Sequence, residues 1–212
     1  MRRGIATLLT TALVLGAAPI VGLALPSSTA IIDAVEEDWQ LVVETPDPVE
    51  AGPQITTSMR PTVGDNASFI DFDLNYREYP DFDPGGMQIQ VWSGEDCVQT
   101  ATQQTAQLDT PGETVSWTQR MSVSGGTITY NIVNGQSTTW GQFGQGEGQL
   151  SVSQASSVSS LSGYSPDDSV ARSGVSWQSN HVTSLTLKQV RYYAAGVLVN
   201  TDTTPRTVNL NP

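Results

Sequence analysis

Asp71 and Asp73 stand two positions apart in a segment whose intervening and flanking residues, Ile70, Phe72 and Leu74, are apolar. On an extended strand, residues two apart share one face and lie about 7 Å from each other. Two carboxylates at this spacing can serve as general acid and general base in a hydrolysis. An alternating strand also needs a polar outer face, and this pattern favours a solvated surface over a catalytic pair.

Two further pairs of aspartates have ligand types that suit Ca²⁺. Asp81 and Asp83 lie in a loop rich in Pro and Gly at 80–86, where carboxylates and backbone carbonyls can share a cation. Asp167 and Asp168 form a similar pair after Pro166. Neither pair fits the twelve-residue calcium loop, and turn formation by Asp side chains explains both. No cofactor is required by the sequence, and Ca²⁺ at Asp81 and Asp83 is the metal hypothesis.

The familiar catalytic sets are missing. His181 is the single histidine, which excludes a zinc site built from several histidines. The motif Gly-x-Ser-x-Gly, which would mark an activated serine, occurs nowhere after residue 30. We therefore assign no catalytic residue from the sequence.

Exposed aromatic rings beside amides and carboxylates would suit a sugar, because the rings stack on its apolar faces. Trp140 in Thr139-Trp140-Gly141, with Tyr79 and Phe82 in the proline-rich loop, are the ligand-binding candidates. Trp117 alternates in phase with Val115 and is expected in the core, where large aromatics usually pack.

Alternation of apolar and polar residues dominates the chain after Trp39 and predicts β-strands. Gly125-Gly126, Asn134-Gly135 and Ala195-Gly196 follow alternating segments and predict hairpin turns. The alternation changes phase near 188–189, where one bulge would restore a single inward face. The Ser-rich stretch 151–162 is either a surface loop or one or two weak edge strands.

These patterns predict an all-β fold, an antiparallel two-sheet sandwich, and no window after residue 39 carries a sustained helical period. A closed barrel stays open as an alternative, because alternation alone does not reveal whether a sheet has edges.

The N-terminus has the layout of a secretory signal peptide at 1–30, with Arg2 and Arg3 before an apolar stretch that ends in small residues. Residues 31–212 are expected to form a single domain. Cleavage would leave a secreted, periplasmic or cell-surface protein with no stable membrane insertion. Cys97 is the single cysteine, so no internal disulfide can form, and a buried thiol is expected.

The chain is acidic. Without residues 1–30 it keeps seven basic and 21 acidic residues, a net charge of about −14. Such a surface repels phosphate backbones and anionic headgroups, which argues against nucleic acid and membrane surfaces as partners. Neutral polymers and divalent cations remain compatible with it.

Several segments resemble a group of uncharacterised secreted bacterial β-sandwich proteins over about 36–208: EEDW at 36–39, NGQSTTWG at 134–141, GYSP at 163–166 and VRYY at 190–193. More distantly, 128–143 resembles the middle of concanavalin A-like lectin and laminin G-like domains. That likeness implies a jelly-roll fold and recognition of extracellular carbohydrate or matrix. The Glu-x-Asp-x-x-Glu run of concanavalin A-like glucanases is absent, so no catalytic residue carries over.

Three functions follow as hypotheses. The first is an exported, non-enzymatic binding or surface-associated module, with carbohydrate as its ligand. The second is a carbohydrate-active enzyme with an unfamiliar site, at Asp71 and Asp73 or at Asp81 and Asp83. The third is a purely structural envelope or matrix protein.

Overall fold

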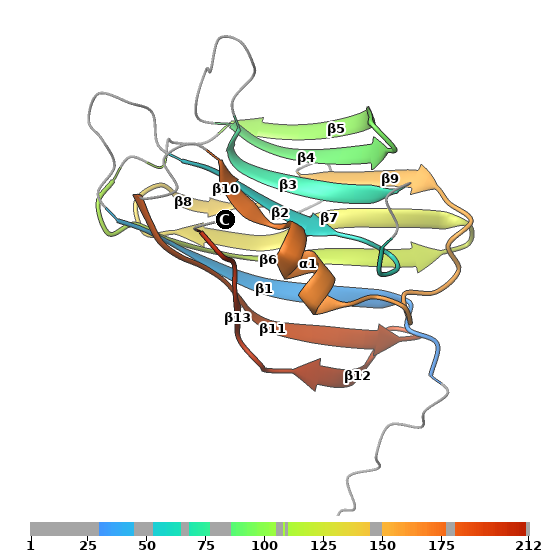
Figure 1. Ribbon diagram of the computed structural model, residues 1–212. Helices are drawn as coiled ribbons and strands as arrows, with labels where there is room; N and C mark the ends of the chain where they lie inside the picture. Colours follow the sequence, from blue (N-terminus) through green and yellow to red (C-terminus); the bar gives the residue numbers. More distant parts are fainter. Residues whose placement is uncertain are drawn as a thin grey trace, which may run out of the picture.

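The computed structural model describes residues 30–44, 53–64, 68–76, 86–104, 108, 110–144, 150–176 and 181–210. These residues form two antiparallel β-sheets packed face to face (Figure 1). The prediction of an all-β sandwich is confirmed.

One sheet has eight strands in the order β12-β11-β1-β6-β7-β8, with β13 paired to β11 and β9 paired to β7. Its strands are β1 (Ala34–Val43), β6 (Thr114–Ser124), β7 (Thr127–Ser137), β8 (Gly141–Phe143), β9 (Ser151–Ala155), β11 (Val182–Ala194), β12 (Val197–Asp202) and β13 (Arg206–Thr207). The other sheet has five strands in the order β10-β2-β3-β4-β5. Its strands are β2 (Gln54–Met59), β3 (Phe69–Tyr76), β4 (Gly86–Ser93), β5 (Asp96–Gln104) and β10 (Gly174–Ser176).

The core lies between the inner faces of the two sheets. The alternating residues Ile70, Phe72 and Leu74 of β3 are all buried there, as their spacing predicts. Trp39 of β1 and Trp117 of β6 stack with ring centroids 6.3 Å apart, and Phe72 packs edge-on against Trp117 at 5.9 Å. These aromatic contacts join the two sheets, and they confirm that Trp117 is a core residue.

Two of the three predicted hairpin turns are present. Gly125 and Gly126 link β6 to β7 with φ of +55° and +77°, and Ala195-Gly196 links β11 to β12 with φ of +50° and +75°. Positive φ at both central residues gives a two-residue turn the twist of the flanking strands, and glycine adopts it without steric cost.

The predicted bulge in β11 lies at Lys188. Asp38 of β1 faces Gln189, whereas the next residue, Trp39, faces Leu187. Lys188 is therefore the extra residue, and it returns Leu187 and Val190 to the same inward face.

The prediction of a turn at Asn134-Gly135 is wrong, because both residues lie inside β7. A Cβ on Gly135 would lie 2.3 Å from ring atoms of Phe143, so the glycine allows a close approach of this ring. The nearby irregularity is a bulge at Val133, since Thr118 pairs with Asn134 and Gln119 with Ile132.

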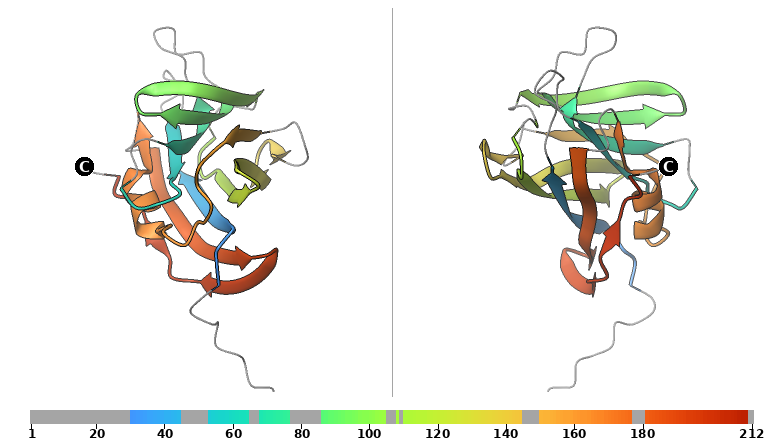
Figure 2. Two further views of the ribbon diagram at one scale, coloured as in Figure 1. Left: turned by 90° about the vertical axis from the view of Figure 1, so that its right-hand side faces the viewer. Right: turned by 60° about the vertical axis from the view of Figure 1, so that its left-hand side comes forward.

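A short helix, α1 (Pro166–Arg172), was not predicted, because seven residues are too few for a helical period. Ser165 caps the N-terminus of this helix. Its side chain accepts a hydrogen bond from the Asp168 N–H, and Pro166 occupies the first turn. α1 contacts β2 of one sheet and β13 of the other, and Figure 2 shows it on the opposite side of the molecule from β8. The helix therefore covers one open edge of the sandwich.

Asp167 and Asp168 belong to the first turn of α1 and pair with cations from the protein. Asp168 lies 3.3 Å from Arg172 and 3.9 Å from Arg60, and Asp167 lies 2.5 Å from Arg206. Across the described ranges, no helix has the length and apolarity needed to cross a membrane.

The substitution Gly135→Ala tests the close packing on β7. We expect it to destabilise the protein by about 1–3 kcal/mol, because the added methyl must displace the Phe143 ring. Urea unfolding at neutral pH measures the change. The control is Gly174→Ala, where a Cβ meets no atom within 4 Å and the expected change is within about 0.5 kcal/mol. Equal stabilities of the two variants would contradict the packing role.

Candidate functional site

The outward face of the five-stranded sheet carries hydrogen-bonding side chains around a carboxylate pair. Strand register places these side chains in two rows across four strands. The first row is Thr56, Asp73, Gln88 and Thr102, and the second is Ser58, Asp71, Gln90 and Thr100. We call these eight residues the polar face.

Asp73 is almost completely buried, with 3% of its surface exposed. The Thr56 hydroxyl donates to its Oδ1 over 2.5 Å. Burial raises the pKa of Asp73 to about 7, against the lowering effect of the Thr56 hydrogen bond, and the charge of Asp71 raises it further. The Asp73 carboxyl therefore holds a proton under mildly acidic conditions.

Asp71 is partly exposed and keeps a lower pKa than its neighbour. Burial raises the pKa of Asp71 to about 6, while a hydrogen bond from Ser58 and the charge of Arg60 lower it. Both carboxyls of the pair therefore have raised pKa values, and Asp73 is the more buried of the two.

The interpretation of both aspartates as a solvated strand surface is wrong for Asp73. Thr56 on β2 and Gln88 on β4 stand directly beside it, and only 3% of its surface is exposed. A carboxyl enclosed in this way, without a cation bonded to it among the described residues, is a candidate for proton chemistry.

The two glutamines stand between the aspartates and the edge strand β5. Gln90 Nε2 donates to Gln88 Oε1 over 2.6 Å, and Gln88 Nε2 donates to Thr102 Oγ1 over 3.1 Å. Both glutamines are partly exposed, so they can exchange these bonds for bonds to a ligand.

A stack of rings borders the second row. Phe69 and Trp92 are stacked with centroids 5.9 Å apart, and the Arg60 guanidinium lies 4.5 Å from the centre of the Phe69 ring. Trp92 is partly exposed, and its buried indole Nε1 has no hydrogen-bond partner. The polar face and this aromatic pair therefore form one continuous surface on β3 and β4.

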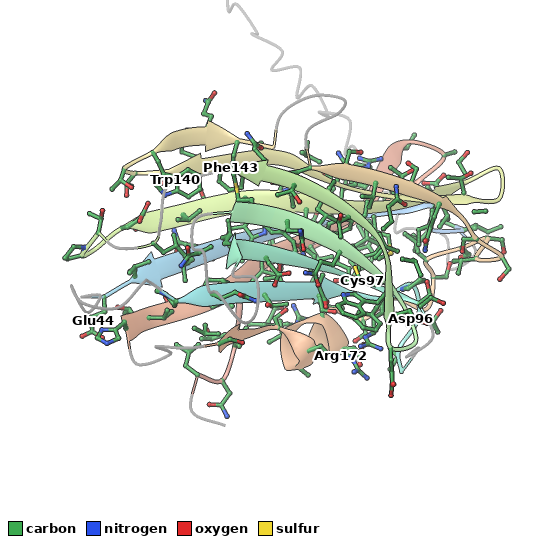
Figure 3. The ribbon with its side chains drawn as sticks, turned by 90° about the horizontal axis from the view of Figure 1, so that it is seen from above. Glu44, Asp96, Cys97, Trp140, Phe143 and Arg172 are labelled. Carbon is green, nitrogen blue, oxygen red and sulfur yellow. The ribbon has the colours of Figure 1, made fainter. Side chains whose placement is uncertain are left out.

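Of the predicted aromatic candidates, Trp140 does not belong to this surface. It is half-buried and packs against Phe143 with centroids 5.1 Å apart. Figure 3 shows Trp140 and Phe143 at one end of the molecule and Cys97, the β5 residue opposite Trp92, toward the other. Tyr79 and Phe82 lie outside the described residues.

The predicted calcium ligands Asp81 and Asp83 also lie outside the described residues. Within the described part of the chain, no group of three or more His, Cys, Asp or Glu side chains could hold a metal ion. Cys97 is exposed, so the expectation of a buried thiol is wrong. It shares the outward face of edge strand β5 with Thr100 and Thr102, where little packs over the sheet.

The outward face of the eight-stranded sheet carries a second cluster of charged side chains, whose carboxylates are neutralised by ion pairs with arginines. Arg191 lies 2.9 Å from Glu36 and 2.5 Å from Asp38, and Arg120 lies 2.6 Å from Glu36. Burial alone would raise the pKa of Glu36, but hydrogen bonds from Tyr193, Arg191 and Arg120 lower it overall. Stable ion pairs of this kind fit a structural role better than proton transfer.

Sequence reasoning found Asp71 and Asp73 but missed Gln88, Gln90 and Trp92. A usable signal existed, because the apolar residues Met87, Ile89 and Val91 alternate with polar ones, which places the residues between them on the outward face. The pairing of β2 with β3, which brings Thr56 and Ser58 to the site, had no comparable signal.

Comparisons with known proteins do not identify the site. No family model matches the chain, and no curated protein matches it. Among solved structures, the chain is similar to the crystal structure of Scytalido-glutamic peptidase with a peptide-based transition state analog, with a TM-score of 0.31 and 9% identity over 82% of each chain. A likeness this low does not bear on the chemistry of the polar face.

The substitution Asp73→Asn tests the buried acid. Because the pKa of Asp73 is raised from 3.8 to about 7 on folding, its contribution to stability is complete below about pH 4 and is lost as the pH rises toward 7. We expect the variant to match the wild type near pH 4 and to be more stable by on the order of 2–4 kcal/mol at pH 8. Denaturant unfolding at both pH values measures this.

The matched control is Asp96→Asn, at an exposed aspartate of β5, with an expected change within about 0.5 kcal/mol at both pH values. A stability difference for Asp73→Asn that does not depend on pH would contradict the raised pKa.

Proposed function

We propose that this chain is an exported binding module whose polar face binds a neutral, hydroxyl-rich polymer, with extracellular carbohydrate as the ligand class. The proposal rests on one observation: the two rows of the polar face, made of Thr, Ser, Asp and Gln side chains, lie beside the stacked rings of Phe69 and Trp92. Carboxylates and amides bond hydroxyl groups, and the partly exposed Trp92 ring offers an apolar surface beside the second row.

The dimensions and the charge support the same ligand class. Four adjacent strands span three spacings of about 4.8 Å, so each row is about 14 Å long and can contact successive units of a polymer. The negative charge of the chain disfavours polyanions, and a neutral polysaccharide avoids this repulsion. The leader-like segment 1–30 favours action outside the cytoplasm.

A glycan array followed by calorimetry with neutral polysaccharides, with and without Ca²⁺, tests binding. We expect the double variant Gln88→Ala/Gln90→Ala to weaken binding about tenfold, because two hydrogen bonds to the ligand are lost. Trp92→Ala should weaken it similarly through loss of the ring.

Gln142→Ala, at an exposed glutamine of β8, is the matched control and should bind like the wild type. The absence of binding to any neutral glycan, in either condition, would refute the carbohydrate proposal.

A second candidate function at the same face is hydrolysis of a glycosidic bond, favoured by the raised pKa values of the two neighbouring aspartates. Asp73 would donate its proton to the leaving oxygen, while Asp71 would accept a proton from an attacking water. Two positions apart on a strand, the Cα atoms lie about 7 Å from each other, and carboxyls that extend in parallel from them would leave room for that water, as inversion of configuration requires.

Release of reducing ends from a polysaccharide panel tests this second function. The reaction needs Asp71 ionised and Asp73 protonated, so we expect a rate maximum between about pH 6 and 7. Asp71→Asn and Asp73→Asn should each lower the rate by about a hundredfold or more, whereas Asp96→Asn should not change it. Equal activity in both site variants and the wild type would exclude this mechanism.

A further inference from the structure

A polar network is enclosed in the core, between the two sheets, and Glu37 of β1 lies at its centre with no exposed surface. Glu37 Oε2 accepts from Trp39 Nε1 over 2.9 Å and from Gln119 Nε2 over 2.5 Å. Glu37 Oε1 accepts from the Tyr164 hydroxyl. Among the described residues, the hydrogen-bond partners of Glu37 include no Arg, Lys or His.

Gln119 of β6 extends the network to the opposite sheet. Its Oε1 accepts from Thr57 Oγ1 of β2 over 2.8 Å, from Tyr130 over 2.9 Å and from Trp117 Nε1 over 3.3 Å. An indole N–H can only donate, so Trp117 requires an oxygen at this end of the Gln119 amide. The amide nitrogen must then face Glu37, which leaves Glu37 Oε2 as an acceptor.

This orientation leaves Oε1 as the position of any proton on Glu37, and a protonated Oε1 would donate to the Tyr164 oxygen instead of accepting from its hydroxyl. Burial raises the pKa of Glu37, although hydrogen bonds from Tyr164, Trp39, Ser169 and Gln119 lower it in part. The titratable groups around it are tyrosines: Tyr164 and Tyr130, whose pKa values burial raises well above 10, and Tyr192 against the Tyr164 ring. Burial therefore favours the protonated, neutral form of Glu37.

The network holds β2 from two directions. From inside the core, Gln119 binds the Thr57 hydroxyl. From the edge of the sandwich, Ser169 of α1, which is hydrogen-bonded to Tyr164, donates to the backbone carbonyl of Ser58 over 2.6 Å. Ser173 then accepts from the backbone N–H of Ser58 over 3.1 Å.

The opposite face of β2 serves the two aspartates of the polar face. Thr56, next to Thr57, donates to Asp73, and Ser58 is hydrogen-bonded to Asp71. Thr57 lies between these two residues in sequence and points the other way. The groups that hold β2 and the groups that bond the aspartates are thus neighbours on a single short strand.

We propose that Gln119, Glu37 and Tyr164 are positioning residues for the polar face: they fix β2 so that Thr56 and Ser58 stay bonded to Asp73 and Asp71. The inference rests on the proposed function only in treating these aspartates as the chemical centre. A network in the core thereby controls proton binding by Asp71 and Asp73 on the outer face.

Carbon-13 NMR titration of the Asp71 and Asp73 carboxyls in the full chain tests the proposal without a ligand. Thr57→Val removes the hydroxyl that Gln119 holds and keeps the volume, so β2 loses its inner attachment. Because the Thr56 hydrogen bond lowers the pKa of Asp73, its weakening should raise that pKa by about half a pH unit or more. Tyr164→Phe removes the hydroxyl that is hydrogen-bonded to Ser169 and so loosens the contact of α1 with Ser58; it should act in the same direction on Asp71.

Glu37→Gln is the matched control. Its amide can accept from Trp39 and Gln119 and donate to Tyr164, so it reproduces the protonated acid and should leave both titrations unchanged. If Thr57→Val and Tyr164→Phe lower stability but leave both titrations as in the wild type, the network is only structural and the proposal is wrong. A shift caused by Glu37→Gln would overturn the neutral assignment.

The titrations separate this proposal from the proposed function. Shifted pKa values in a protein that neither binds nor hydrolyses glycans would uphold the positioning role and refute the function. If Thr57→Val does not fold, Tyr164→Phe decides the outcome alone, because the Phe ring retains the packing against Tyr192.

Discussion

The carboxyl group of Glu37, enclosed between the two sheets, is the constraint on which the other contacts depend. Without a cation bonded to it among the described residues, it is tolerable in the core only as a fully hydrogen-bonded group, because an unsatisfied buried polar atom costs about 1–3 kcal/mol. Trp39, Gln119 and Tyr164 meet this requirement. In doing so they tie β1, β6 and the segment before α1 to one point, so the two sheets and the helix have a single relative placement.

The same requirement connects the core with the outer face. Gln119 satisfies Glu37 on one side and Thr57 on the other, and Thr57 belongs to the strand that supplies hydroxyls to Asp71 and Asp73. Three carboxyls with raised pKa values thus lie on two layers of the sandwich and share β2 as the element between them. All three favour the folded state more at acidic than at alkaline pH, whereas the ion pairs of Glu36 and Asp38 contribute stability at higher pH.

A binding face and a pair of proton-carrying groups are compatible on one surface. The glutamines and Trp92 are accessible enough to meet a ligand, while Asp73 is enclosed enough to keep a proton near neutral pH. Binding needs only the accessible glutamines and Trp92, whereas hydrolysis also needs the proton of Asp73. On the eight-stranded sheet, by contrast, Arg191 and Arg120 neutralise the outward carboxylates of Glu36 and Asp38.

The sequence by itself determined the strands, the inward faces, the Lys188 bulge and two hairpin turns, because alternation and turn chemistry are local properties of neighbouring residues. It also marked Asp71 and Asp73 as a pair on one face. Only the tertiary structure decided that Asp73 is buried and that Asn134-Gly135 lies within a strand against Phe143, because both depend on residues distant in sequence. The partners of Glu37 were hidden for the same reason: Gln119 is 82 positions away and Tyr164 is 127 positions away, and no local pattern records which side chains a fold brings together.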